Sequence, residues 1–599
     1  MRQPPSRPGQ HIRYSVLSLA LLILGGCGAA PEKQPEQVAQ APQQPVATQQ
    51  GISLALPPSD FSNEFSAAEQ SLQNFDWMSA SVILDPLAEQ PLNRDDSSYL
   101  SYLQARIAYT RGLQPQALLG LESLEYPGTN AALQYRARDL RRQALALSGD
   151  HLESARLGDL MLRNAPSEKT DMLRREIWHN LQQLDQQQLQ QAMDATTDLR
   201  WHGWLELAAI SRTSGPGNTL ELAAWRSNNA QHPAADTLPG GLAYLLEANP
   251  AQVQKVALLL PLSERLAPAG KAVLDGYLAS YYASYSRPEL AILDLDQYPS
   301  ATAAYNAAMA QGANLVVGPL SKEAVGELGK LPQRPVPVLA LNRAGQTDDT
   351  GGGSLVQLSL APEDEAALIA EHAFGQGARS ALIIRPAGSW GNKMESVLRQ
   401  RWAALGGTVT GSESYTGRED YSPSVKNGLD IFNSERRARS IRDMLATNIE
   451  STGRRRQDID TIFLLSRSAA DARSIKPLLS FHYAGDLPVY ATSSIYSGIP
   501  DPRDKDLNGI NLVEIPWLLG TSPGLRVAIA AGGTGSDNYT RLNALGTDAH
   551  LLQSRFMQLQ AGPDALLRGN TGLLTLDQKQ RIHRELSLAT FDGGKLRPQ

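Results

Sequence analysis

The chain has 599 residues, of which 42% are hydrophobic, with a single cysteine and a formal net charge of −6. This length suggests about three or four domains with several hydrophobic cores. The weak negative charge argues against general nucleic-acid binding, and one cysteine excludes an intramolecular disulfide and a cysteine-based metal site.

The beginning of the chain has the features of a bacterial targeting segment. Three arginines precede a mostly apolar run over residues 16–24, which is too short to span a bilayer as a helix. The run ends in Leu-Gly-Gly-Cys, which resembles the lipobox of bacterial lipoproteins. The resemblance implies a signal peptide of residues 1–26, cleavage between Gly26 and Cys27, and a lipid anchor on the Cys27 thiol.

The residues after the cleavage site predict where the anchor is placed. In lipoproteins, Asp directly after the cysteine favours inner-membrane retention, so Gly28 indicates the outer membrane of a Gram-negative cell, on its periplasmic side. Residues 27–58 are rich in Ala, Gln and Pro and contain few large apolar residues, which predicts a disordered linker behind the anchor. In an extended polyproline-like form it would span under roughly 90 Å.

Residues 59–249 are predicted to form a helical domain, because apolar residues recur at spacings of three and four. Ala68 and Ala80 lie twelve residues apart, Ala105 and Ala117 repeat that spacing, and leucines follow each pair at the same offsets. Small residues at matched positions allow two antiparallel helices to pack closely. The pattern resembles tetratricopeptide repeats, and a generic helical bundle remains the alternative.

Residues 250–599 are predicted to form an α/β domain, because short apolar runs alternate with helical segments. Two such series imply two lobes with a cleft between them. The fold class is therefore α plus α/β, with a tetratricopeptide-like helical domain followed by a two-lobed α/β domain. The predicted strands are 256–260, 290–295, 315–317 and 336–341, then 381–384, 409–415, 462–465 and 489–491.

Three segments resemble successive strand-to-helix turns of type I periplasmic binding proteins; they are residues 256–263, 312–321 and 335–342. In that family the loops after the first-lobe strands contact a small ligand, and the matching positions are Ser263, Ser321 and Asn342. Serine-rich turns can bind a carboxylate, although ordinary turn and helix-cap roles explain the same residues.

A longer resemblance covers essentially the whole chain. Residues 481–498, 506–510 and 516–519, together with the order of lipobox, linker, helices and α/β domain, resemble the LpoA family of outer-membrane lipoproteins. The resemblance implies a non-enzymatic regulator of peptidoglycan synthesis that binds and activates penicillin-binding protein 1A without a cofactor. The alternative is a lipid-anchored solute-binding receptor for a small amino-acid-like ligand, so the question of a small ligand stays open.

Motifs of enzymes are incomplete in this sequence. The Gly270-Lys271 pair lacks the residues of a phosphate-binding loop, and the nine histidines have no metal-ligand spacing. Ser536, Asp537 and Asn538 match one element of penicillin-binding proteins, without a Ser-x-x-Lys or Lys-Thr-Gly partner. We therefore predict no catalytic residue, no metal site and no cofactor, and a peptidoglycan hydrolase receives little support.

A basic cluster lies in the second predicted lobe. It comprises Arg436, Arg437, Arg439, Arg442 and residues 454–456. Such a cluster can steer an acidic partner surface, and a solvated helix face is the equally simple alternative.

Overall fold

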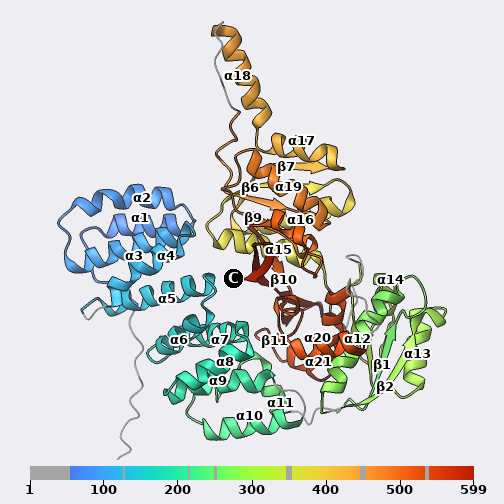
Figure 1. Cartoon of the computed structure of the whole chain (residues 1–599). Helices are drawn as coiled ribbons and strands as arrows, with labels where there is room; N and C mark the ends of the chain where they lie inside the picture. Colours follow the sequence, from blue (N-terminus) through green and yellow to red (C-terminus); the bar gives the residue numbers. More distant parts are fainter. Residues whose placement is uncertain are drawn as a thin grey trace, which may run out of the picture. The chain divides into compact units, whose positions relative to one another are not determined.

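The computed structural model describes residues 54–125, 128–212, 216–247, 253–285, 287–345, 354–445, 453–532 and 539–599 (Figure 1). Residues 50–599 form one compact unit. The predicted signal peptide, Cys27 and the predicted linker up to residue 53 lie outside the described residues. Within the described ranges, no helix has the length and apolar character needed to cross a bilayer.

The described chain up to Glu247 is helical, and consecutive helices pack against one another, as predicted for helix hairpins. The repeat positions Ala68, Ala80, Ala105 and Ala117 are all buried, which explains why small residues recur there. The helices are α1 (Ser62–Gln73), α2 (Trp77–Leu84), α3 (Arg94–Thr110), α4 (Gln114–Glu122), α5 (Ala131–Leu147), α6 (His151–Leu162), α7 (Ser167–Gln183), α8 (Gln186–Ala195), α9 (Leu199–Arg212), α10 (Pro216–Asn228) and α11 (Ala243–Glu247).

Local sequence determines where several of these helices begin. The side chains of Asp76, Asn93, Asn130, Asp150 and Asp185 each accept a hydrogen bond from a backbone N–H in the first turn of the following helix. Such caps satisfy donors that have no partner inside the helix.

The first lobe of the α/β domain is built on a parallel sheet of order β2-β1-β3-β4-β5. Apolar cores cover both of its faces, one formed with α12 and α21 and the other with α13 and α14 (Figure 1). The elements are β1 (Lys255–Leu260), α12 (Ala267–Ala283), β2 (Glu289–Asp294), α13 (Ala301–Ala310), β3 (Leu315–Val317), α14 (Lys322–Gly329), β4 (Val338–Ala340), β5 (Leu355–Gln357) and α21 (Thr540–Leu559).

The second lobe is built on a sheet of order β15-β14-β10-β9-β8-β6-β7. Helices α17 and α19 contribute to the core on one face, and α15 and α16 to the core on the other. The elements are α15 (Pro362–Gly375), β6 (Ser380–Pro386), α16 (Ser389–Leu405), β7 (Thr408–Tyr415), α17 (Arg418–Gly428), α18 (Ile431–Leu445), β8 (Thr461–Leu464), α19 (Ala469–Phe481), β9 (Val489–Ala491), β10 (Ile510–Glu514), α20 (Pro523–Gly532), β14 (Ser587–Asp592) and β15 (Lys595–Pro598).

These sheets confirm the predicted fold class, while the chain end adds strands that the sequence pattern did not predict. Strand β14 pairs antiparallel with both β10 and β15. A separate antiparallel sheet consists of β11 (Leu567–Arg568), β12 (Leu573–Leu576) and β13 (Ile582–Glu585). The predicted helix at 441–447 is also longer toward its N-terminus, since α18 begins at Ile431.

Helix α21 comes after β10 and α20 of the second lobe along the chain but packs in the first lobe, and two glycines explain how it does so. It lies against α12, and a Cβ added at Gly276 would overlap the backbone carbonyl of Asn543. A Cβ at Gly546 would overlap the carbonyl of Val273 in the same way. The close crossing of these two helices therefore requires glycine on each of them.

Candidate functional site

The three residues predicted to line the cleft all have partners within the protein. The Ser263 hydroxyl donates to Asp294, and its backbone N–H donates to Asp296 at 3.0 Å. Ser321 caps α14 by accepting from the Ala324 N–H at 3.2 Å. These contacts are the turn and cap roles that the sequence left as the alternative, and a ligand contact at these positions stays a prediction.

Asn342 follows β4 and joins two neighbouring loops. Its Nδ2 donates to the Leu320 carbonyl at 2.9 Å, next to Ser321, and its Oδ1 accepts from the Arg343 N–H at 2.9 Å. The structure therefore brings Ser321 and Asn342 into adjacent loops, as expected for the ends of adjacent parallel strands.

A bidentate ion pair links the first-lobe loop after β4 to α15, a second-lobe helix. Both terminal nitrogens of Arg343 lie 2.8 Å from the Asp364 carboxylate oxygens, and one also donates to the Ile582 carbonyl at 2.8 Å. Both side chains are largely buried. Paired and hydrogen-bonded in this way, the two charges hold the lobes together at this point.

A second polar contact, within the second lobe, occupies the loop after β9. Glu365 is fully buried and accepts from the backbone N–H of Ser493 at 2.8 Å and from its hydroxyl at 3.0 Å. Burial raises the pKa of Glu365, despite the nearby Arg584 guanidinium. Arg541, which pairs with Glu514, donates to the Ser493 carbonyl at 3.1 Å. The backbone and side-chain polar groups of Ser493 in this loop are therefore bonded within the protein.

Sequence reasoning did not identify Arg343, Asp364, Glu365 or Arg541. Isolated charged residues have no periodicity or motif, and their partners lie in other elements, from 21 residues away for Arg343 to 128 residues away for Glu365. Nothing in a single sequence distinguishes them from surface charges.

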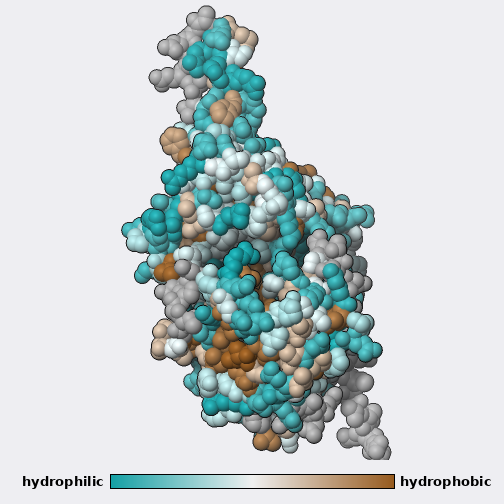
Figure 2. All heavy atoms as spheres, turned by 90° about the vertical axis from the view of Figure 1, so that its right-hand side faces the viewer, coloured by the Kyte–Doolittle hydropathy of each residue, from teal (hydrophilic) through white to brown (hydrophobic). Residues whose placement is uncertain are grey.

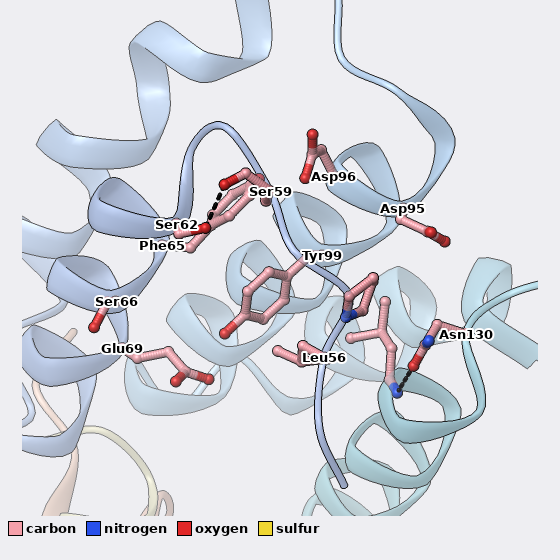
Figure 3. Close-up of a pocket in the computed structure, with 12 residues that line it drawn as sticks. Leu56, Ser59, Ser62, Phe65, Ser66, Glu69, Asp95, Asp96, Tyr99 and Asn130 are labelled. Carbon is pink, nitrogen blue, oxygen red and sulfur yellow. Dashed lines mark hydrogen bonds between the residues drawn. The ribbon is translucent and has the colours of Figure 1, made fainter. Parts of the chain in front are cut away.

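A pocket of about 160 Å³ lies in the helical domain, where the predicted linker meets α1 and α3 (Figure 3). Leu56 and Tyr99 lie side by side in the lining of the pocket (Figure 3). Glu69 lies on one side of them, and Asp95 and Asp96 lie on the other. Burial, and then the neighbouring Glu69, raises the pKa of Tyr99.

Two of the three acidic groups of this pocket have partners. Glu69 lies 3.0 Å from Arg136, and Asp96 accepts from the Asn93 amide at 2.7 Å. Leu56 packs against the helical core, so the last residues of the predicted linker are part of the wall of the pocket. We interpret the pocket as the place where the linker joins the domain.

The basic cluster divides into two parts. Arg455 and Arg456 are structural, since they pair with Asp486 at 2.7 Å and Asp458 at 2.6 Å. Arg436, Arg437, Arg439 and Arg442 lie on α18, whose only buried residue is Ile431. Arg454 lies in the segment that returns from α18, and its backbone N–H donates to the Ser434 hydroxyl. Among the described residues, no group of three or more His, Cys, Asp or Glu side chains is arranged to hold a metal ion.

Comparison with known proteins covers most of the chain. The family model described as "LppC putative lipoprotein" matches residues 59–594. A protein of Vibrio vulnificus named penicillin-binding protein activator LpoA is 28% identical over 87% of this chain and 88% of its own length. A protein of the same name from Photobacterium profundum is 27% identical over 77% and 76%.

Among solved structures, full-length LpoA from Haemophilus influenzae matches with a TM-score of 0.48 at 21% identity, covering 90% of this chain and 94% of that one. The family match confirms the resemblance found in the sequence. Because the family model spans almost the entire described part of the molecule, the chain belongs to the LppC lipoprotein family, and its relatives in that comparison are named LpoA.

Proposed function

We propose that this protein is an activator of penicillin-binding protein 1A. The observation that carries the proposal is the match to proteins named penicillin-binding protein activator over 87% of this chain and 88% of the relative. A match along most of both lengths supports a shared helical domain, a shared α/β domain and a shared order of the two.

We place the protein at the outer membrane. The lipobox ending at Cys27, the Gly at position 28 and membership of a lipoprotein family support this location. An anchor followed by a linker would present the folded part to a synthase fixed in the other membrane.

We propose that the activator acts by binding the synthase and catalyses no reaction itself. An activator that binds the active conformation of the synthase more tightly than the inactive one shifts the population toward activity. The contacts of Arg343 with Asp364 and of Glu365 with Ser493 support a stiff binding body, because they tie loops that would otherwise be available to a ligand.

The test is a reconstitution with purified penicillin-binding protein 1A. We expect the protein to bind the synthase and to raise the rate of peptide crosslinking, while a solute-binding protein of similar size has no effect. A titration that reaches micromolar concentrations without binding or any rate change would contradict the proposal.

The receptor alternative is distinguished by ligand-dependent stability. A solute bound at Ser263, Ser321 or Asn342 would raise the thermal midpoint, and the stabilisation would grow with the logarithm of its concentration once that exceeds the dissociation constant. We expect no such shift with amino acids, because the hydroxyl and amide groups of these residues already have internal partners.

A further inference from the structure

Helix α18 extends away from the second lobe (Figure 1) and is solvent-exposed along most of its length. Figure 2 shows this projecting part at the top of the view, with hydrophilic atoms interrupted by apolar ones. A helix that contributes one buried residue to its own domain is not required for the core of that domain.

One face of α18 nevertheless carries an apolar stripe. Its residues alternate in spacing between three and four, the pattern of a helix that packs along another helix. The stripe comprises Ile431, Ser434, Ala438, Ile441 and Leu445.

The two ends of the stripe differ in how they are covered. Near the lobe, the backbone N–H of Arg454 donates to the Ser434 hydroxyl at 3.0 Å, so a returning segment lies over the stripe. At the far end, Ile441 is 48% exposed and Leu445 56%, and Met444 beside them is 75% exposed. Exposed apolar side chains grouped in this way mark interaction sites.

The charge of the helix indicates the kind of partner. Within α18 there are four arginines and two acidic residues, Glu435 and Asp443, which is an excess of positive charge in a chain of net charge −6. Arg437 lies on the edge of the stripe, 3.5 Å from Asp430. Arginine is enriched in protein interfaces because its planar group binds carboxylates in pairs of hydrogen bonds.

We infer that the far end of α18 is a docking helix for an acidic, apolar-centred groove on the synthase. The inference rests on the proposed function and adds the surface that makes contact. Ile441 and Leu445, the exposed end of the stripe, would enter the groove, and the arginines would pair with carboxylates at its rim.

The shape of the stripe favours a protein groove over a lipid surface. Membrane-surface helices present a broad face of large apolar residues, whereas this stripe is narrow and includes Ser434 and Ala438. The one aromatic residue, Phe432, lies elsewhere on the helix with the Lys426 ammonium 5.1 Å from its ring centre.

The test compares two variants of the full chain that each add one negative charge. Ile441→Asp changes the stripe, and Ser440→Asp changes the exposed neighbouring position on another face of the helix. We expect Ile441→Asp to weaken binding to purified penicillin-binding protein 1A about tenfold or more, and Ser440→Asp to change it less than about threefold. Unchanged thermal midpoints would show that both variants fold.

The other outcomes separate the hypotheses. If the unaltered chain binds the synthase and Ile441→Asp binds equally well, the docking inference is wrong and the proposed function stands. If the unaltered chain does not bind, both fail. Equal weakening of synthase binding by the two variants would mean that α18 contributes only long-range charge attraction. Two further results would assign the helix to another partner if synthase binding persists in Ile441→Asp. Loss of binding to phosphatidylglycerol vesicles in this variant would assign the helix to a membrane. Loss of self-association would assign it to a second copy of the chain.

Discussion

The imidazole Nε2 of His179 lies 2.7 Å from a carboxylate oxygen of Glu585. His179 is on α7 of the helical domain and Glu585 is at the end of β13, so this contact joins the two halves of the chain. Gln183, one turn further along α7, donates to the other oxygen of Glu585 at 2.7 Å.

This contact predicts that the stability of the junction depends on pH. Burial alone would lower the pKa of His179, but the hydrogen bond and charge of Glu585 outweigh it and raise the pKa. A raised histidine pKa stabilises the fold below about pH 6.5, and this contribution is lost as the pH rises through the folded-state value. The pKa of Glu585 is lowered, so this residue stabilises the fold above its ordinary pKa and loses that contribution as the pH falls through the folded-state value.

We therefore expect His179→Gln to be destabilising at pH 6 and nearly neutral at pH 8.5. Because the two side chains are 41% and 40% exposed, the loss at pH 6 should stay under about 1 kcal/mol. Urea unfolding at both pH values measures it. His151 and His372, which also face Glu585, are present in both proteins and cancel in the comparison. An effect that grows with pH would contradict the assignment.

A second junction depends on glycine. Gly112 of the helical domain and Gly377 after α15 both have positive φ, and a Cβ at Gly377 would overlap the carbonyl of Arg111. We expect Gly377→Ala to cost about 1–2 kcal/mol for the backbone conformation and about 1–3 kcal/mol more for the overlap.

Gly406→Ala is the matched control for this contact. Gly406 has a similar positive φ, but a Cβ there meets nothing within 4 Å, so only the conformational cost applies. Thermal unfolding should show a larger loss for Gly377→Ala, together with faster proteolysis between the two domains. Equal losses would mean that the close approach contributes nothing.

A buried carboxylate organises the turn between β11 and β12. Asp548 on α21 accepts from the backbone N–H groups of Asn570 at 2.6 Å and Thr571 at 2.7 Å. Asp548→Asn replaces one acceptor oxygen with a donor, so one of these N–H groups loses its partner. We expect a loss of about 1–3 kcal/mol in chemical denaturation.

The loss at Asp548 should also vary with pH. Burial raises the pKa of Asp548 to about 6. A raised carboxyl pKa stabilises the fold at low pH and loses that contribution as the pH rises through about 6. The difference between the original protein and Asp548→Asn should therefore be larger at pH 4.5 than at pH 7.5. Equal losses at the two pH values would show that the carboxyl is ionised at both, and the opposite order would show that its pKa is lowered; either result contradicts the assignment.

The anchor leads to a prediction in cells. Cys27→Ala removes the thiol that would carry lipid, and we expect no palmitate labelling and loss of the protein from the membrane fraction. Gly28→Asp should instead keep the lipid and move the protein to the inner membrane. If that variant supports normal synthase activity, the outer-membrane part of the proposal is wrong.

Much of the architecture could be predicted from local sequence. A helix or strand buries one periodic set of its own residues, so its pattern can be read from neighbours along the chain. The alanine spacing at Ala68 and Ala80 and the apolar run of β1 are such patterns. The hairpin of β14 and β15 was missed although its Gly593-Gly594 turn is a local signal. The pairing of β14 with β10 gives no such signal, because the two strands lie more than 70 residues apart.

By itself, the sequence determined the resemblance of residues 24–27 to a lipobox, the order of a helical and an α/β domain, and the resemblance to the LpoA family. Only the tertiary structure decided that Ser263, Ser321 and Asn342 have internal partners and that His179 meets Glu585, 406 residues away. The reason is that periodicity records burial, which is local to an element. The partner of a single polar side chain is set by how distant elements come together when the chain folds.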